Sequence, residues 1–553
     1  MKHSNDLNNI YFISYFIKKF IKKFLMKKKD KLKSNFFKFH QSKLFKIREN
    51  EKKNLIILVC LESFENYFTL IWIYIARSLR LKKYSFLALS LKKNNTVNKI
   101  LKFGNIKIIY LDEEIIKLKK THNYKRKLNI FENKCKNLKN FKDYYNFKIN
   151  NLIIGRWAIS NFCRIHKVGY IDYNSKLQKF DLDLKLKNIF NVFLVMNEII
   201  NLKKPKFFFM TEKNLDSYVG VFMSALFKNK EIINWHGSNV SVDSFILKKI
   251  TIKNYDQHHS SLSPPTWKKI KKEDNKKKLN KINKNFLLSR YYNSTPPFSR
   301  NLLNVKKYSK NEIKEKYSIK NNLPNVIIFS HILHDLIFFF GKEIYKTYSE
   351  WLIETVKLSC KNKKVNWFIK FHPSNIYRGE FKDGFSKEEE ILKKFVKKLP
   401  SHIKLVYPNT KINPLSWMNF ADMAVTVRGT SGLEMASMGK TVITTGSNRY
   451  ENKGFTIDPK NKNNYRKIML NLSNNYQFKN KSKNNNANKY LFGIFSKKLF
   501  YIDFLKIDHV PKLFNWDDII SIPSHEFKKK SITKNLILFE KFLRNKTEID
   551  FLR

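Results

Sequence analysis

Hydrophobic residues along the chain are concentrated in short runs that alternate with longer, mixed stretches. The runs are Leu55–Leu61, Ser85–Ser90, Ile106–Leu111, Lys206–Met210, Glu231–Gly237, Val326–Phe329, Asn366–Phe371, Met423–Val427 and Thr441–Thr445. Strands that are buried on both faces have this continuous apolar character. Helical patterns lie between the runs, at Phe68–Leu81, Tyr218–Phe227 and Leu433–Met438. The alternation predicts an α/β protein with parallel sheets and right-handed crossovers.

A turn rich in glycine and hydroxyl residues follows the run Met423–Val427. Its sequence is Arg428-Gly429-Thr430-Ser431-Gly432, and a helix and a second strand come after it. This βαβ order places backbone N–H groups and two hydroxyls at a helix N-terminus, where anions bind. Glu434, just inside the helix, is placed to accept hydrogen bonds from sugar hydroxyls. The alternative is a turn that only caps the helix, with Glu434 favoured by the helix dipole.

A second candidate site lies where His372 and Pro373 end the run Asn366–Phe371. In an open α/β sheet the carboxyl ends of the strands form the ligand crevice. An imidazole at that edge donates a hydrogen bond to a phosphate oxygen. Lys370 and Arg428 are further candidates for this contact, and the alternative for both is an ordinary surface charge.

Three polar residues, His331, His334 and Asp335, follow the run Val326–Phe329. The spacing of the histidines lets one helical face hold both. The same spacing suits a metal ion, but the sequence has no third ligand at a spacing typical of metal sites. We therefore favour packing or a substrate contact for these side chains.

Together these segments resemble the capsule polysaccharide biosynthesis proteins, Kdo-transferase-like enzymes with the GT-B glycosyltransferase fold. The matching segments are Phe329–Asp335 (FSHILHD), Lys370–Pro373 (KFHP), Val425–Gly446 (VTVRGTSGLEMASMGKTVITTG) and Gly454–Pro459 (GFTIDP). The resemblance covers Asn325 to Pro459 and is weaker in the first half, where Gly155–Ser160 (GRWAIS) is similar. It implies two Rossmann-like domains that face a cleft, with C-terminal helices that cross back to the first domain.

The resemblance also implies an activity. A sugar would move from a nucleotide-sugar donor to a growing capsule or lipopolysaccharide-type polysaccharide, or to its lipid-linked acceptor. His372, Thr430, Ser431 and the N–H groups of Gly429–Gly432, with Arg428, would stabilise the charge on the leaving phosphate. Glu434 would bind the ribose hydroxyls. With these donors the resemblance implies neither a metal ion nor a further cofactor.

The acceptor hydroxyl in such a reaction needs a base near the cleft. Glu212 is the first candidate, because it follows the strand predicted at Lys206–Met210, and Asp216 is close to it. Glu62 and Glu65, after the first strand, are alternatives. For each of these residues a capping or solvated role is the competing interpretation.

Length and composition are compatible with a large two-domain enzyme, because 553 residues with 42% hydrophobic residues suffice for two cores. The expected division is 1–53 basic extension, 54–250 first Rossmann-like domain, 251–324 lysine-rich interdomain segment, 325–489 nucleotide-sugar-binding domain and 490–553 C-terminal helical segment. Most of 251–324 and of 460–488 is expected to be loop. The four cysteines are widely spaced, which indicates reduced structural thiols.

The N-terminal stretch Tyr11–Met26 combines paired aromatic and aliphatic residues every four positions with lysines in the gaps. On a helix this makes an apolar stripe opposite a basic side, which is typical of a helix lying on an anionic membrane. Packing on the protein's own core is the alternative. No apolar run is long enough to span a bilayer and no signal peptide is visible. We therefore expect a cytoplasmic protein held peripherally at the inner face of the membrane.

Two other classes of function remain open. A polyol-phosphate transferase of the teichoic-acid kind also uses His-Pro and Ser-rich turns, although such enzymes typically pair Asp with Tyr-Ser-Ser. A non-enzymatic membrane or nucleic-acid binder is suggested by the formal charge of +64. No nucleic-acid-binding signature is visible, so no specific nucleic-acid partner is expected.

Overall fold

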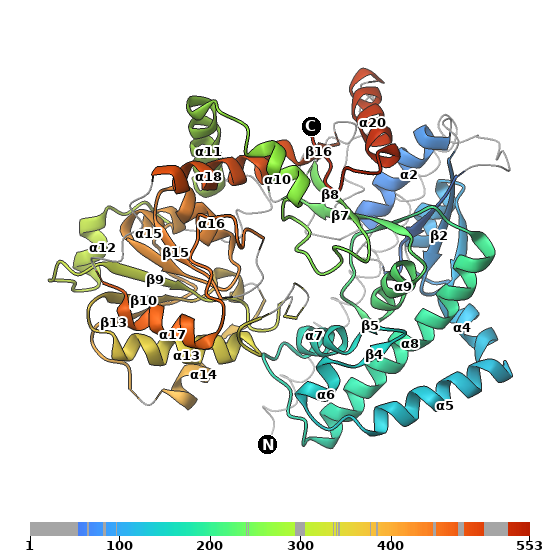
Figure 1. Ribbon diagram of the computed structural model, residues 1–553, viewed down its shortest axis with the longest axis horizontal. Helices are drawn as coiled ribbons and strands as arrows, with labels where there is room; N and C mark the ends of the chain where they lie inside the picture. Colours follow the sequence, from blue (N-terminus) through green and yellow to red (C-terminus); the bar gives the residue numbers. More distant parts are fainter. Residues whose placement is uncertain are drawn as a thin grey trace, which may run out of the picture.

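The computed structural model contains two α/β domains, each built on its own sheet (Figure 1). It describes residues 54–62, 66–80, 84–95, 97–238, 240–241, 243–292, 305–335, 337–338, 340, 343–376, 378–382, 385–396, 398–445, 449–473, 481–502 and 529–553. The amphipathic stretch Tyr11–Met26 lies outside these residues. The two parallel-sheet domains confirm the predicted fold class.

A seven-stranded sheet forms the first domain, with the spatial order β16-β8-β7-β6-β1-β2-β3. Its strands are β1 Asn54–Val59, β2 Tyr84–Ser90, β3 Lys107–Tyr110, β6 Phe207–Met210, β7 Glu231–Gly237, β8 Ser244–Ile250 and β16 Leu499–Tyr501. The strands from β7 to β3 pair in parallel, whereas β8 is antiparallel to both of its neighbours, β7 and β16. The chain builds the sheet outward from β1 through β2 to β3 and then continues with β6 on the other side of β1, so the strand order reverses between β1 and β6.

Helices cover both faces of this sheet. They are α2 Asn66–Arg80, α3 Val97–Phe103, α4 Leu111–Lys119, α5 His122–Lys136, α6 Phe141–Tyr145, α7 Gly155–His166, α8 Lys176–Lys203 and α9 Asp216–Phe227, and a hairpin of β4 Lys148–Ile149 and β5 Leu152–Ile153 precedes α7. Alternate residues of a strand face opposite sides. Ile56 and Leu58 accordingly pack against α2, whereas Ile57 and Val59 pack in the core that α7, α8 and α9 share.

The second domain has a fully parallel five-stranded sheet in the order β13-β10-β9-β14-β15. Its strands are β9 Asn325–Phe329, β10 Asn366–Lys370, β13 Ile403–Val406, β14 Met423–Val425 and β15 Thr441–Ile443, and β11 Phe381–Lys382 and β12 Phe385–Ser386 form a separate hairpin. Its helices are α13 Tyr348–Lys361, η3 Pro373–Asn375, α14 Lys387–Phe395, α15 Pro414–Phe420, α16 Thr430–Ser437 and α17 Lys462–Asn471. The strand order reverses between β9 and β14.

Residues 251–324 were expected to be mostly loop, and this is correct only in part, because helices lie among them. They contain α10 Pro264–Ile270, α11 Lys276–Tyr291 and α12 Lys310–Lys316. In α11 the buried residues Leu279, Asn283 and Leu287 recur every four positions, so one face of this lysine-rich helix is covered. Residues 460–488 are not mainly loop, because α17 and the start of α18, Lys481–Phe492, lie there.

After α18 the chain returns to the first domain. α18 packs against α11 and α16, and it is followed by the π-helical turn η5 Gly493–Lys497 and by β16, which pairs with β8. α20 Lys529–Arg544 then packs on α2. A buried ion pair of 2.6 Å between Lys498 and Asp550 ties the end of the chain down. The expected C-terminal helical segment 490–553 is therefore correct only in part, because residues 490–497 are helical in α18 and η5 but β16 follows them.

All four cysteines are free, and Cys60, Cys135 and Cys163 are buried, as the sequence indicated. Within the described ranges, none of the helices has both the length and the apolar character needed to cross a bilayer.

Candidate functional site

The carboxyl ends of the parallel strands of both sheets lie at the junction between the domains. Ligands of open α/β sheets bind at this edge, where the strand order reverses. The reversal lies between β9 and β14 in the second domain and between β1 and β6 in the first. Phe340 joins the two sides, because its ring centroid lies 4.5 Å from that of His258 and 5.4 Å from Nζ of Lys213. The junction is therefore where a shared site would form.

His372 follows β10 and is the N-cap residue of η3. Its Nδ1 accepts a hydrogen bond of 3.1 Å from the Ser374 N–H. Burial, with the nearby charges of His331 and Lys370, lowers the pKa of His372 to about 3. The imidazole is thus neutral at physiological pH, and because Nδ1 accepts, the ring proton is on Nε2. Lys370 is also buried, and burial lowers the pKa of its ammonium group to about 8.

His331 follows β9 and has the opposite tautomer. Its Nδ1 lies 3.1 Å from the Ile332 carbonyl oxygen, which only accepts, so Nδ1 carries the proton. Burial lowers the pKa of His331 to about 4. The ring packs 4.5 Å from the ring of Tyr348. His331 therefore presents an unprotonated Nε2.

The glycine-rich turn connects β14 to α16 as the sequence predicted. Gly429 is the N-cap residue of α16, and its carbonyl accepts a 2.8 Å hydrogen bond from the Tyr450 hydroxyl. A Cβ atom at Gly432 would collide with that hydroxyl, so this position requires glycine. Thr430 and Ser431 are partly exposed. Within the described part of the chain their backbone N–H groups have no protein acceptor, which leaves two donors at the helix N-terminus.

Arg428 and Glu434, the other two candidates near this turn, are both engaged within the protein. Arg428 forms a buried ion pair with Glu343. Burial lowers the pKa of Arg428 to about 9. The side chain of Glu434 is fully buried, with Oε1 3.0 Å from Nε of Arg290 and Oε2 accepting a 2.6 Å hydrogen bond from Tyr291. The ribose contact stays a prediction, and it requires Glu434 to exchange one of these partners.

His331 and His334 do not share the helical face that their spacing allowed, because His334 and Asp335 lie in a turn. His334 Nε2 lies 3.5 Å from a carboxylate oxygen of Glu380, and Asp335 lies 3.4 Å from Arg378. Burial lowers the pKa of His334 to about 4, so its imidazole is neutral at physiological pH and this contact is not a pair of opposite charges. The described residues contain no cluster of three or more His, Cys, Asp or Glu side chains placed to hold a metal ion.

Glu212 lies directly after β6, on the first-domain side of the junction. Its Oε2 accepts a 2.9 Å hydrogen bond from Arg164, and its Oε1 accepts two of 2.8 Å from the N–H groups of Lys213 and Asn214. Both carboxylate oxygens are therefore occupied in this structure. The negative charge of Glu212 is the main cause of the raised pKa of Arg164, and that of Asp335 in the second domain adds to it. The pair of Arg164 and Glu212 therefore faces the second domain.

The other carboxylates considered as bases lie in different surroundings. Asp216 begins α9 and accepts a hydrogen bond from Asn161, and burial raises its pKa to about 6. Burial also raises the pKa of Glu62, which follows β1. Glu65 lies outside the described residues.

The sequence interpretation missed three histidines that meet at the junction. The ring of His236, at the end of β7, stacks on that of His259 at 3.6 Å between centroids, and His259 lies 4.1 Å from His258. Burial lowers the pKa of all three. Nδ1 of His236 donates to the Gly237 carbonyl at 2.8 Å, so its Nε2 keeps a lone pair. His236 stands at a predicted strand end, a signal that was available, whereas His258 and His259 follow no pattern.

Arg449 is the other missed residue. Burial is the largest cause of the lowered pKa of His236 in the first domain and of His331 in the second. The positive charge of Arg449 adds to the lowering of both pKa values. Burial lowers the pKa of Arg449 itself. No carboxylate in the described ranges forms an ion pair with its guanidinium. An arginine in this position is suited to bind an anion between the domains.

No protein-family model matches the chain, and no curated protein matches it. Solved structures with similar folds include the Thermosulfurimonas dismutans KpsC beta Kdo 2,7 transferase, with 17% identity over 57% of this chain and 84% of that chain and a TM-score of 0.34. A glycosyltransferase from Rickettsia africae has 10% identity over 90% of this chain and 100% of that chain, with a TM-score of 0.25.

A UDP-GlcNAc 2-epimerase from Neisseria meningitidis, bound to UDP-GlcNAc, has 11% identity over 80% of this chain and 96% of that chain, with a TM-score of 0.23. The two-domain α/β architecture of the chain is given by its own two sheets, and these similarities add no argument to it. At these identities and TM-scores the similarity identifies no substrate.

Proposed function

We propose that this chain is a glycosyltransferase that uses a nucleotide-sugar donor to extend a surface polysaccharide or its lipid-linked acceptor. The observation that carries the proposal is the convergence of anion-binding groups at the junction. His372 follows β10 and the start of α16 follows β14, the two neighbours of β9, so topology brings Nε2–H of His372, the helix N–H groups and Lys370 to the edge at which ligands of this fold bind. The positive charge of Arg449 acts on His331, at the end of β9 on the same edge.

In the proposed reaction an acceptor hydroxyl attacks the anomeric carbon of the donor sugar. A glycosidic bond forms, and the bond from that carbon to the phosphate oxygen breaks with its electron pair staying on the nucleotide. The leaving phosphate becomes more anionic in this step, and fixed donors that meet the developing charge lower the barrier. His372, Thr430 and Ser431 supply neutral donors, and Arg449 supplies a charge.

The hydroxyl proton must pass to a base on the first-domain side. Glu212 is one candidate, although its carboxylate already accepts three hydrogen bonds. His236 is the second, because it is neutral and its Nε2 lone pair is available. Loss of transfer in Glu212→Gln, with His236→Gln still active and donor binding unchanged in both, would assign the base to Glu212. The reverse result would assign it to His236.

A thermal-shift screen against CMP-, UDP-, GDP- and dTDP-linked sugars tests the proposed donor class, because a ligand that binds only the folded state raises its stability. We expect one nucleotide family to raise the melting temperature and Arg449→Ala to abolish the shift. Lys460→Ala, a change at an exposed lysine, is the control. If no nucleotide sugar stabilises the protein and a CDP-linked polyol does, the polyol-phosphate transferase is the better assignment.

We also propose that the protein acts at the inner face of the cytoplasmic membrane, where a lipid-linked acceptor would be available. The support is the basic amphipathic sequence of Tyr11–Met26. Binding of this stretch to an anionic membrane surface is independent of the chemistry at the junction, and it has its own test below.

A further inference from the structure

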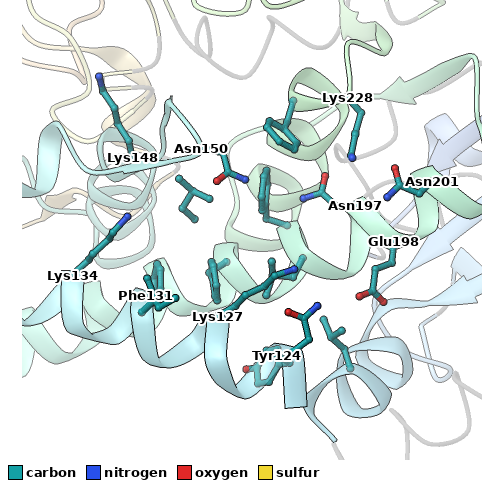
Figure 2. Close-up of a pocket in the computed structure, with 18 of the residues that line it drawn as sticks. Tyr124, Lys127, Phe131, Lys134, Lys148, Asn150, Asn197, Glu198, Asn201 and Lys228 are labelled. Atoms are coloured by element: carbon teal, nitrogen blue, oxygen red, sulfur yellow. The ribbon is translucent and has the colours of Figure 1, made fainter. Parts of the chain in front are cut away.

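A pocket of about 370 Å³ lies on the first domain, away from the domain junction. Its walls come from α5, the β4–β5 hairpin, α8 and the end of α9 (Figure 2). None of the junction residues lines it. Its volume is at the lower end of the range for pockets that hold small organic ligands.

The interior of the pocket is apolar and mainly aromatic. Phe131 of α5 stacks on Phe190 of α8 at 4.2 Å between ring centroids. The other apolar lining residues are Leu118, Tyr124, Phe147, Ile149, Phe193 and Leu194. Two more lining residues are open to solvent, with Ile130 54% and Phe227 39% exposed. The apolar surface therefore continues from the interior to the solvent.

The surroundings of this apolar surface are basic. Lys127 and Lys134 come from α5, Lys148 from the hairpin and Lys228 from the end of α9, so lysines line the pocket from separate elements (Figure 2). Glu198 is the one acidic residue among the lining residues, which leaves a formal surplus of three positive charges. A pocket of this kind complements a molecule with an apolar body and an anionic end.

The hairpin turn and α8 add polar groups between the lysines. Asn150 and Asn151 have φ values of 45° and 65°, which a two-residue turn of this hairpin type requires and asparagine tolerates. Asn150 lines the pocket, as do Asn197 and Asn201 of α8. The side-chain oxygen of Asn197 is buried and has no protein partner in the described structure.

We propose that this pocket binds an anionic lipid, with one hydrocarbon chain against the aromatic interior and the headgroup phosphate among the lysines. The depth of apolar lining favours a hydrocarbon chain over a nucleotide, whose sugar and base would leave polar atoms unpaired there. The lysines favour a phosphate over a zwitterionic headgroup, because each lysine near an anionic surface adds to binding. The site would give the first domain a membrane contact that does not depend on residues 1–53 or on the proposed activity.

The test measures binding of dodecyl phosphate, below its critical micelle concentration, to the full-length protein by calorimetry. We expect saturable binding that is at least about tenfold tighter than that of zwitterionic dodecylphosphocholine. The double variant Lys127→Glu, Lys134→Glu should weaken it at least about tenfold. The control is Lys125→Glu, Lys136→Glu, which changes the same net charge on the same helix at exposed residues outside the pocket.

A second variant tests the apolar interior. Leu194→Trp fills the pocket from α8 without changing charge, and we expect it to abolish binding while the melting temperature of the unliganded protein shows that the domain still folds. Equal weakening by the two lysine pairs would mean that only net charge matters, and it would overturn the proposal. Unchanged binding in Leu194→Trp, or equal affinity for inorganic phosphate, would also overturn it.

Discussion

Replacement of His372 by asparagine separates the two roles that the structure gives this side chain. Nδ1 accepts the Ser374 N–H and caps η3, while Nε2–H is available to a ligand. Asparagine is among the best capping residues and its side-chain oxygen can accept the same N–H group. It has no donor that reaches as far as Nε2. His372→Asn should therefore keep the cap and lose the ligand contact.

The expected size of the effect follows from the type of bond. A hydrogen bond to a charged group contributes about 1.5–3 kcal/mol, so the affinity for the nucleotide sugar should fall roughly 10- to 150-fold. Because His372 has a pKa of about 3, it acts as a neutral donor, and the loss should be the same at pH 6 and pH 8. Stability should change little in His372→Asn, whereas His372→Ala should also lose about 1 kcal/mol with the cap.

The assay is calorimetric titration with the nucleotide sugar that gives the largest thermal shift, combined with urea unfolding of each variant. His166→Asn, at a histidine of α7 whose side chain is 45% exposed, is the control. Wild-type affinity and turnover in His372→Asn would refute the phosphate contact. An affinity loss found only in His372→Ala, in proportion to its loss of stability, would show that the residue only shapes the turn.

Three further predictions follow from other parts of the chain. Glu434→Gln should lower the free energy of unfolding by about 3–5 kcal/mol, because Arg290 loses its buried partner; nucleotide affinity unchanged well below the melting temperature would limit Glu434 to packing, and a tenfold loss would support the ribose contact. Acid should destabilise the protein, because the pKa values of His236, His258, His259, His331, His334 and His372 are lowered on folding, so the unfolded state binds more protons as pH falls below 6.5. The loss at pH 5.5 is at most about 1.4 kcal/mol per histidine, and a melting temperature that does not change between pH 7.5 and 5.5 would contradict it. Deletion of residues 1–50 should reduce the fraction of the protein that sediments with anionic vesicles, and should make that fraction less sensitive to added salt. Undiminished binding would show that this stretch is not the main anchor.

The strands were predictable because parallel strands covered on both faces need continuous apolar runs. β1, β2, β6, β9 and β10 each match a run to within a few residues. The helices α10, α11 and α12 were missed because their buried residues are few and lie among lysines and asparagines. In α11 the buried positions are Leu279, Asn283 and Leu287, a stripe too sparse for the periodicity to predict.

The candidate site divides in the same way. Residues at strand ends, such as His331, His372 and Glu212, could be predicted as candidates because topology alone brings the carboxyl ends of parallel strands to one edge. Contacts with distant segments were not found. Arg290 reaches Glu434 across more than a hundred positions, and nothing local in either segment indicates the pair.

In the reaction proposed above, the buried histidines would orient a phosphate, and other side chains would compensate its charge. Each imidazole is neutral because burial lowers its pKa, so it contributes a direction rather than a charge. The backbone selects the tautomer, with a proton on Nε2 of His372 and a lone pair on Nε2 of His331 and His236. The positive charge is left to Lys370 and Arg449. A neutral imidazole can donate a hydrogen bond to a phosphate oxygen and stay neutral. The proposed phosphate contact and the proposed acceptance of the hydroxyl proton would therefore use different side chains at the junction.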